Sequence, residues 1–265
     1  MKVEFEESYH NFENTKGELL FGVLGKPVST RYPGKLPCLI MCHGLRQNCH
    51  QRKFVELSWH LAYHGIASFG LDFAGHGQSS GDLEDSSIIN QVDDLGSAYQ
   101  YLKLNREKFK IDLDRIAFLG HSLGALIAVL FQAQYLDAAK TLILLAPALH
   151  QRELIKEWHT PEEIKSWKEC HYLDTKKGRI GLQYFKEAVS RNWADEVSNI
   201  TVRTLMISGD QDDDVPLEYN QHVYGRFSDK IASWEHVSHA DHNFESYRAK
   251  EDLNFMVLKW LNRFL

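Results

Sequence analysis

The sequence lacks several features that mark secreted and membrane proteins. It has only four cysteines, Cys38, Cys42, Cys49 and Cys170, which are too few and too scattered for a disulfide scaffold. Its longest apolar runs, such as 141–149, are too short to cross a bilayer. The first ten residues, MKVEFEESYH, contain no apolar segment of the kind that a signal peptide requires. We therefore expect reduced thiols, no membrane span and a cytoplasmic location.

The sequence also lacks the excess of basic residues that is typical of nucleic-acid-binding proteins. The 30 lysines and arginines stand against 36 aspartates and glutamates, which gives a net charge of −6, and no basic block occurs. Hydrophobic residues make up 43% of the 265 positions and charged residues 25%, so the chain can bury a sizeable core. These values favour a globular protein of one or two domains without a nucleic-acid partner.

Short apolar runs alternate with segments of helical periodicity along most of the chain. Runs such as CLIMC at 38–42 are continuously apolar, which is typical of strands covered on both faces of a parallel sheet. The first two runs alternate more and predict an antiparallel hairpin at one edge. The pattern as a whole predicts an α/β fold. The predicted strands are 2–6, 18–24, 38–42, 67–71, 116–119, 141–145, 204–208 and 231–235, and the predicted helices are 54–63, 87–103, 122–135 and 253–265.

One long segment interrupts this alternation. Residues 147–201 contain no convincing strand, and helices are predicted at 151–157, 161–170 and 178–191. Because insertions of this length in a compact domain are usually functional, we interpret 147–201 as a helical lid. Residues 1–146 and 202–265 then form the core domain. A plain helical insertion without a substrate role is the alternative.

The strongest chemical signal is the pentapeptide GHSLG, residues 120–124. It follows the apolar run IAFL and precedes an apolar helical segment, and this strand–turn–helix context is the one that a nucleophile elbow requires. Glycines two residues on either side of Ser122 allow strand and helix to pass closely. The pattern predicts Ser122 as a catalytic nucleophile, with an ordinary helix-capping serine as the alternative.

A nucleophilic serine needs a base and an orienting acid, and in this kind of fold they follow it in the order acid, then histidine. Both types of residue occur after predicted strands, in that order. The spacing alone does not choose among them. The candidate acids are Asp210, Asp212, Asp213 and Asp214, and the candidate bases are His236, His239 and His242.

Five motifs together resemble the α/β-hydrolases, and within them the cinnamoyl (feruloyl) esterases and the monoacylglycerol lipases. The resemblance implies an α/β-hydrolase fold, a mostly parallel eight-stranded sheet with helices on both faces and an inserted helical lid. It also implies that Asp212 is the acid and His242 the base. The motifs are MCHGLRQN at 41–48, LDFAGHGQSSG at 71–81, GHSLG at 120–124, GDQDDDVP at 209–216 and ADHNF at 240–244.

Acyl transfer places negative charge on the carbonyl oxygen, which two main-chain N–H groups stabilise. One comes from the residue after the nucleophile, Leu123. By the resemblance, the second comes from Leu45, just beyond the His43–Gly44 pair. His43 is then expected to brace the loop rather than act as a base.

Other clusters of polar residues have simpler interpretations. A zinc site formed by His236, His239 and His242 with Asp241 matches no usual ligand spacing, and neither do the cysteines and histidines at 42–50. The segment 72–77 is no dinucleotide fingerprint, and no P-loop occurs. Asp93 and Asp94 are interpreted as part of a solvated helix face or as a helix-stabilising pair. We therefore expect no metal and no cofactor.

The predicted function is that of a serine carboxylesterase that hydrolyses a small-molecule ester, with a short acyl chain or an aryl group, through an acyl-enzyme. Trp158 and Trp167 in the lid are candidates to line the acyl or aryl pocket. A thioesterase, an amidase or a peptidase on the same triad is one alternative. A noncatalytic ligand-binding protein with this fold is another. The resemblance also allows a homodimer.

Overall fold

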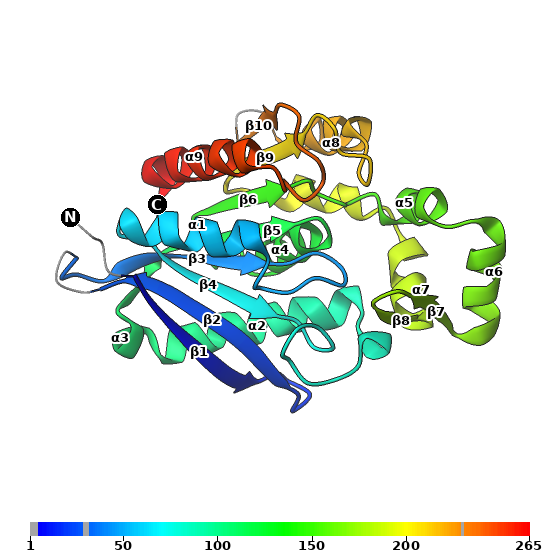
Figure 1. Cartoon of the computed structure of the whole chain (residues 1–265), viewed down its shortest axis with the longest axis horizontal. Helices are drawn as coiled ribbons and strands as arrows, with labels where there is room; N and C mark the ends of the chain where they lie inside the picture. Colours follow the sequence, from blue (N-terminus) through cyan, green and yellow to red (C-terminus); the bar gives the residue numbers. More distant parts are fainter. Residues whose placement is uncertain (1–4, 29–31, 229–230) are drawn as a thin grey trace.

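The computed structural model describes residues 5–28, 32–228 and 231–265. Eight strands form one sheet in the order β1-β2-β4-β3-β5-β6-β9-β10 (Figure 1). Strands β1 and β2 pair in antiparallel fashion, β2 and β4 likewise, and all other neighbours are parallel. The strands are β1 Phe5–Glu13, β2 Leu19–Pro27, β3 Leu36–Cys42, β4 Ala67–Asp72, β5 Ile111–His121, β6 Thr141–Leu145, β9 Arg203–Gly209 and β10 Ala232–Val237. The predicted mostly parallel eight-stranded sheet is confirmed.

Helices cover both faces of this sheet, as Figure 1 shows. Successive residues of a strand point to opposite faces, so a strand between two helical layers must be apolar throughout. In β3, Ile40 packs in the core cluster on the α2 and α4 side, whereas Leu39 and Met41 pack in the cluster on the α1 and α9 side. The helices of the core are α1 Arg52–Tyr63, α2 Ile88–Leu104, α3 Arg106–Phe109, α4 Leu123–Gln134, α8 Leu217–Tyr224 and α9 Tyr247–Phe264, with a short 3-10 helix η1 at Leu83–Asp85.

The segment between β6 and β9 extends beyond the sheet, to the right in Figure 1. It contains the three expected helices but also a two-stranded hairpin, so the expectation of no strand was wrong. The hairpin turns at Lys176 and Lys177, and β8 begins at Gly178, whose φ of 119° favours glycine. Strands of only four residues are too short to show a periodic pattern. The elements are α5 Gln151–Trp158, α6 Pro161–Cys170, β7 Tyr172–Thr175, β8 Gly178–Gly181, α7 Leu182–Ser190 and the 3-10 helix η2 Trp193–Asn199.

Several predicted boundaries were also wrong. The expected helix 178–191 begins only at Leu182, because β8 takes its first residues. The last helix begins at Tyr247 rather than at 253, because the Ser246 hydroxyl caps it by accepting from the Ala249 N–H. The first strand begins at Phe5 and runs to Glu13, and residues 2–4 of the predicted strand 2–6 lie outside the described residues. Helices α3 and α8 were not predicted.

The parallel part of the sheet decides where functional side chains gather. Strands β3, β5, β9 and β10 run in the same direction, so the loops at their carboxyl ends meet at one edge of the sheet. Within the described part of the chain, no helix combines the length and the hydropathy that crossing a bilayer needs.

Candidate active site

Ser122 lies in the sharp turn between β5 and α4. Its backbone has φ 55° and ψ −118°, a conformation that non-glycine residues rarely adopt, and its residue surface is 8% exposed. The flanking glycines are needed sterically. A Cβ at Gly120 would collide with the Gly124 carbonyl, and one at Gly124 would collide with the Cys42 carbonyl at the end of β3. The residues around Ser122 therefore form the strained elbow that the sequence predicts.

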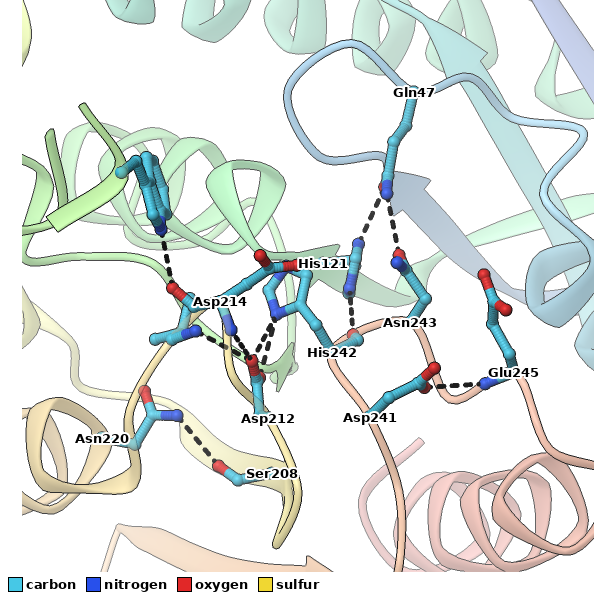
Figure 2. Close-up of polar contacts among 12 residues, drawn as sticks. Gln47, His121, Ser208, Asp212, Asp214, Asn220, Asp241, His242, Asn243 and Glu245 are labelled. Carbon is cyan, nitrogen blue, oxygen red and sulfur yellow. Dashed lines mark hydrogen bonds and ion pairs between the residues drawn. The ribbon is translucent and has the colours of Figure 1, made fainter. Parts of the chain in front are cut away.

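Asp212 and His242 form a buried pair at the ends of β9 and β10. His242 Nδ1 lies 3.1 Å from Asp212 Oδ1 and 2.9 Å from Asp212 Oδ2, as Figure 2 shows. Asp212 Oδ1 also accepts the main-chain N–H groups of Asp214 and Val215 at 3.0 and 2.8 Å. These donors hold the carboxylate in place, so its second oxygen is directed at the imidazole. The contact fixes the ring through Nδ1, so Nε2 is the ring nitrogen that points away from the carboxylate.

His242 lies next to the elbow through the residue that precedes Ser122. His121 Nε2 is 2.8 Å from the His242 carbonyl oxygen, and the two imidazole rings are 4.8 Å apart. Among the described residues, no direct hydrogen bond joins Ser122 to His242. Such bonds are often long in the free form of an enzyme and tighten with substrate. The sequence-predicted serine, acid and histidine are thus brought to one edge of the sheet.

Two main-chain N–H groups beside Ser122 have no acceptor within the described part of the chain, namely those of Leu45 and Leu123. Leu123 is the first residue of α4, where helical N–H groups lack intrahelical partners. The loop that carries Leu45 lies against the elbow, because a Cβ built on Gly44 would be 3.1 Å from Ser122 Cβ. Both residues with free N–H groups are therefore near the elbow, Leu123 next to Ser122 in sequence and Leu45 in the loop that lies against it.

Comparison with known protein families shows to which family this chain belongs. The family model described as serine aminopeptidase, S33, matches residues 36–169, just over half of the chain. The chain belongs to the S33 family of α/β-hydrolases. Monoacylglycerol lipase ABHD6 of Mus musculus is 29% identical over 123 residues, and the match spans 44% of this chain but only 32% of the lipase. This S33 hydrolase therefore matches about a third of the length of its curated relative.

Solved structures share the whole fold of this S33 hydrolase. Est1E from Butyrivibrio proteoclasticus, with ferulic acid bound, superposes with a TM-score of 0.78 at 23% identity, and the match covers 94% of this chain and 98% of Est1E. The α/β-hydrolase GrgF from Penicillium sp. sh18 gives 0.76 at 19% identity over 98% of this chain and 99% of GrgF. Identities this low establish the fold alone. The resemblance to α/β-hydrolases noted in the sequence is confirmed.

The S33 hydrolase contains a polar network behind the elbow that the sequence did not predict. Gln47 Oε1 lies 3.0 Å from His121 Nδ1, and Gln47 Nε2 donates to Asn243 Oδ1 at 2.9 Å, as Figure 2 shows. Lys53 Nζ is 3.4 Å from both His121 Nε2 and Asn243 Oδ1. Burial and the nearby Lys53 hold the pKa of His121 well below its usual range. In the sequence, His121 inside the GHSLG motif was the one residue that could have pointed to this network.

A second buried network braces the loop after β4. Asp94 Oδ2 accepts the Ala74 N–H at 2.9 Å, and Asp94 Oδ1 accepts from Asn14 Nδ2 at 2.8 Å. Burial raises the pKa of Asp94 to about 6. The interpretation of Asp94 as a solvated residue was wrong, because helical periodicity places it on the same face as Leu95 and Ala98, whereas Asp93 is exposed. His43 Nε2 accepts a main-chain N–H of this loop at 3.2 Å, which suits the expected bracing.

The two lid tryptophans occupy different environments. Trp158 is half-buried, packs near Val215, and donates through Nε1 to the Asp214 carbonyl oxygen at 2.8 Å, beside the candidate acid. Trp167 is 1% exposed and packs against Phe185 at a ring separation of 5.2 Å, and its Nε1 has no hydrogen-bond partner within the described part of the chain. Trp158 is therefore the tryptophan nearer to the candidate acid.

Within the described residues, only Cys49, His50 and Asp72 gather as possible metal ligands, with their ligand atoms within 4.8 Å of one another. Both carboxylate oxygens of Asp72 are already occupied. Oδ1 accepts the Cys49 N–H at 2.6 Å, and Oδ2 accepts the Gln78 N–H at 2.8 Å. Asp72 also contributes, after burial, to raising the pKa of the Cys49 thiol, which opposes thiolate ligation. The hydrogen bonds of Asp72 to main-chain N–H groups therefore explain, without invoking a metal ion, why Cys49, His50 and Asp72 lie together.

Proposed function

We propose that this S33 hydrolase is a serine carboxylesterase that cleaves esters with a short acyl chain or an aryl group. The observation that carries the proposal is the buried Asp212–His242 pair beside the strained Ser122 elbow. A carboxylate that fixes an imidazole next to a serine in a strained turn is the arrangement that activates a hydroxyl for acyl transfer. The name of the similar monoacylglycerol lipase supports the same reaction class.

The proposed mechanism has two acyl-transfer steps. Ser122 Oγ attacks the ester carbonyl carbon while His242 Nε2 takes the hydroxyl proton, and Asp212 stabilises the imidazolium that forms. The oxyanion accepts hydrogen bonds from the free N–H groups of Leu45 and Leu123. His242 then gives its proton to the departing alcohol, which leaves an acyl-enzyme. In the second step His242 activates water, which releases the acid and restores Ser122.

The free main-chain donors supply a large share of the expected rate. Removing one oxyanion donor in an enzyme of this kind costs about 2.7–4 kcal/mol of transition-state stabilisation. In this chain Leu123 also stands at the positive end of α4, a helix of 12 residues, which favours developing negative charge. Because both donors belong to the main chain, the aliphatic side chains of Leu45 and Leu123 do not weaken the proposal.

We also propose that residues 147–201 form a lid over the core domain, 1–146 and 202–265, and shape the acyl pocket. Trp158 supports this because its indole is hydrogen-bonded to the loop that carries Asp212. Trp158 is proposed to touch the acyl group. Trp167, which packs inside the aromatic cluster of the lid with Tyr184 and Phe185, is proposed to support the pocket wall from behind.

A peptidase is the second candidate function, because the family model that matches the chain is described as a serine aminopeptidase. The same Ser122, His242 and Asp212 would cleave an amide, with His242 protonating the departing amine. Thioesters are a further alternative on these residues. A noncatalytic ligand-binding protein would leave Ser122 unreactive. The proposed mechanism needs no cofactor, and a cytoplasmic location and a homodimer stay predictions.

Labelling with a fluorophosphonate, combined with a panel of substrates, tests the proposal. Wild-type protein and Ser122→Ala would be compared on p-nitrophenyl esters from acetate to laurate, a matched thioester and an amino-acid p-nitroanilide. We expect labelling that depends on Ser122 and ester turnover that is greatest for short chains. Faster turnover of the anilide would favour the peptidase, and an unlabelled wild-type protein would refute both enzyme proposals.

A further inference from the structure

A cationic pocket of about 440 Å³ adjoins the candidate active site. It lies where the first turn of α1 meets the loops after β3 and β10 and the tip of the β7–β8 hairpin. The whole chain has a net charge of −6, whereas the residues that line this pocket carry a net positive charge. It includes five basic side chains and one carboxylate, namely Arg46, Arg52, Lys53, Lys177 and Lys250 against Glu245.

Two of these lysines are buried without a counter-charge. Lys53 and Lys250 are each 3% exposed, and neither has a carboxylate within ion-pair distance among the described residues. Lysine is almost never buried to this extent unless it is paired, because an isolated ammonium loses its hydration. Among the described residues, Lys250 Nζ donates to the main-chain carbonyl of Glu245 alone, and Lys53 Nζ has two contacts at 3.4 Å. Both lysines are therefore buried in the pocket wall without a carboxylate as a direct partner among the described residues.

The electrostatic state of Lys53 agrees with this shortage of counter-charge. Burial lowers the pKa of Lys53 to about 7, although Asp241 and Glu245 act in the opposite direction. The two carboxylates are thus too distant or too exposed to offset desolvation. An anion in the pocket would lie beside the ammonium and favour its charged form.

The start of helix α1 adds main-chain donors to the same pocket. Gln51, the N-cap residue, makes no side-chain capping bond, and the first turn contains no acidic residue. An uncapped helix N-terminus presents free N–H groups and the positive end of the helix dipole. Arg52 in this turn pairs with Glu56 at 2.6 Å and stays partly available at the surface. The helix end and the buried lysines favour the same kind of ligand.

We propose that the cationic pocket binds the oxyanion group, a phosphate or a carboxylate, of a small ligand. Its occupant would act on the catalytic residues through Gln47, which lines the pocket and bonds to both His121 and Asn243. These two residues directly precede Ser122 and directly follow His242. Figure 2 shows Gln47 bridging them. The oxyanion has two sources, a free anion or a charged group on the ester itself, and the second source rests on the proposed esterase function.

A binding experiment tests the pocket without turnover. Inorganic phosphate and acetate would be titrated into protein carrying Ser122→Ala, with ionic strength held constant by sodium chloride and binding followed by calorimetry. We expect saturable binding that Lys53→Met weakens at least about thirtyfold, as for loss of a buried charged partner. Because methionine replaces a buried, unpaired charge by an apolar chain of similar length, the variant is expected to fold.

Two further variants make the result specific. Arg46→Gln combined with Lys177→Gln removes exposed cations of the pocket and is expected to weaken binding about three- to tenfold. Lys186→Gln removes an exposed cation of α7 outside the pocket and is expected to leave the affinity unchanged. Absence of saturable binding above the chloride control would overturn the proposal, and so would equal affinities of the reference protein and Lys53→Met.

Substrates that differ only in charge identify the source of the anion. The kcat/KM for p-nitrophenyl butyrate would be compared with that for the p-nitrophenyl monoester of glutaric acid, whose acyl chain ends in a carboxylate. A preference for the charged ester that Lys53→Met abolishes would place the anion on the substrate. Phosphate binding without such a preference would indicate a free anion. If neither ester is cleaved, the esterase proposal fails, whereas the calorimetry still decides the pocket.

Discussion

Replacing Asp212 by asparagine is expected to abolish most catalysis while preserving the fold. Asp212 Oδ1 accepts two main-chain N–H groups, at 3.0 and 2.8 Å, so an asparagine oxygen would keep this position. The amide nitrogen would then face His242 Nδ1, where a carboxylate oxygen now lies at 2.9 Å. A donor there forces Nδ1 to accept and moves the ring proton to Nε2. The nitrogen that must take the Ser122 proton is then already protonated.

The expected loss in kcat is about 10⁴-fold, or about 5.4 kcal/mol of transition-state stabilisation, because this exchange leaves the geometry intact but fixes the wrong tautomer. The assay is p-nitrophenyl acetate hydrolysis between pH 5 and pH 9, with thermal unfolding measured on the same preparations. The unfolding midpoint should stay unchanged, because the two main-chain hydrogen bonds to Oδ1 are kept.

Asp213→Asn is the matched control, since Asp213 is exposed in the same loop. It should change kcat/KM by no more than about twofold. The reasoning is refuted if Asp212→Asn retains activity within about tenfold of wild type with an unchanged midpoint. An equal loss in Asp213→Asn would point to a general effect of the loop instead of the tautomer.

Three further outcomes are expected. Gly124→Ala should lower the unfolding midpoint and remove esterase activity, because a Cβ at this position would collide with the Cys42 carbonyl. Gly34→Ala is the control: Gly34 has open space around it, so neither the midpoint nor the activity should change. Burial raises the pKa of Asp94 to about 6, so Asp94 should lower the free energy of unfolding of wild type, relative to Asp94→Asn, by at most about 3 kcal/mol as the pH rises from 4 to 6. Asp94→Asn has no such titration, so its free energy of unfolding, measured with urea at each pH, should lack this fall. If wild type and Asp94→Asn gave parallel curves of unfolding free energy against pH, the burial argument would be contradicted. Trp158→Phe loses a hydrogen bond to the acid loop and should lower kcat/KM for short esters about three- to tenfold, so unchanged kinetics would remove Trp158 from the pocket.

The order of elements in the core follows from local sequence patterns. Continuously apolar runs such as 38–42 and 141–145 mark strands covered on both faces, and the structure places both in the parallel part of the sheet. The elbow is also visible in the sequence, since strand, glycine turn and apolar helix are consecutive. The order of the serine, the acids and the histidines along the chain needs no tertiary information.

Tertiary structure was needed wherever several residues of the same type were candidates for one role. The spacing left four aspartates open after β9, and the resemblance selected Asp212. In the structure Asp212 is the one of these four that contacts His242, because its side chain turns inward while Asp213 and Asp214 are exposed. A loop conformation of this kind depends on main-chain hydrogen bonds that no periodic pattern encodes.

The largest surprises concern buried charge. A helical pattern shows that Asp94 shares a face with apolar residues, but only packing against the loop after β4 supplies its partners. Lys53 is a surface residue by its type and is buried by its position, because its ammonium group lies against His121 at the end of β5 and Asn243 after β10, two distant parts of the sequence. Local patterns determine which elements form, since they depend on neighbours along the chain. The tertiary structure alone decides which polar groups lose water, because that depends on which distant segments meet.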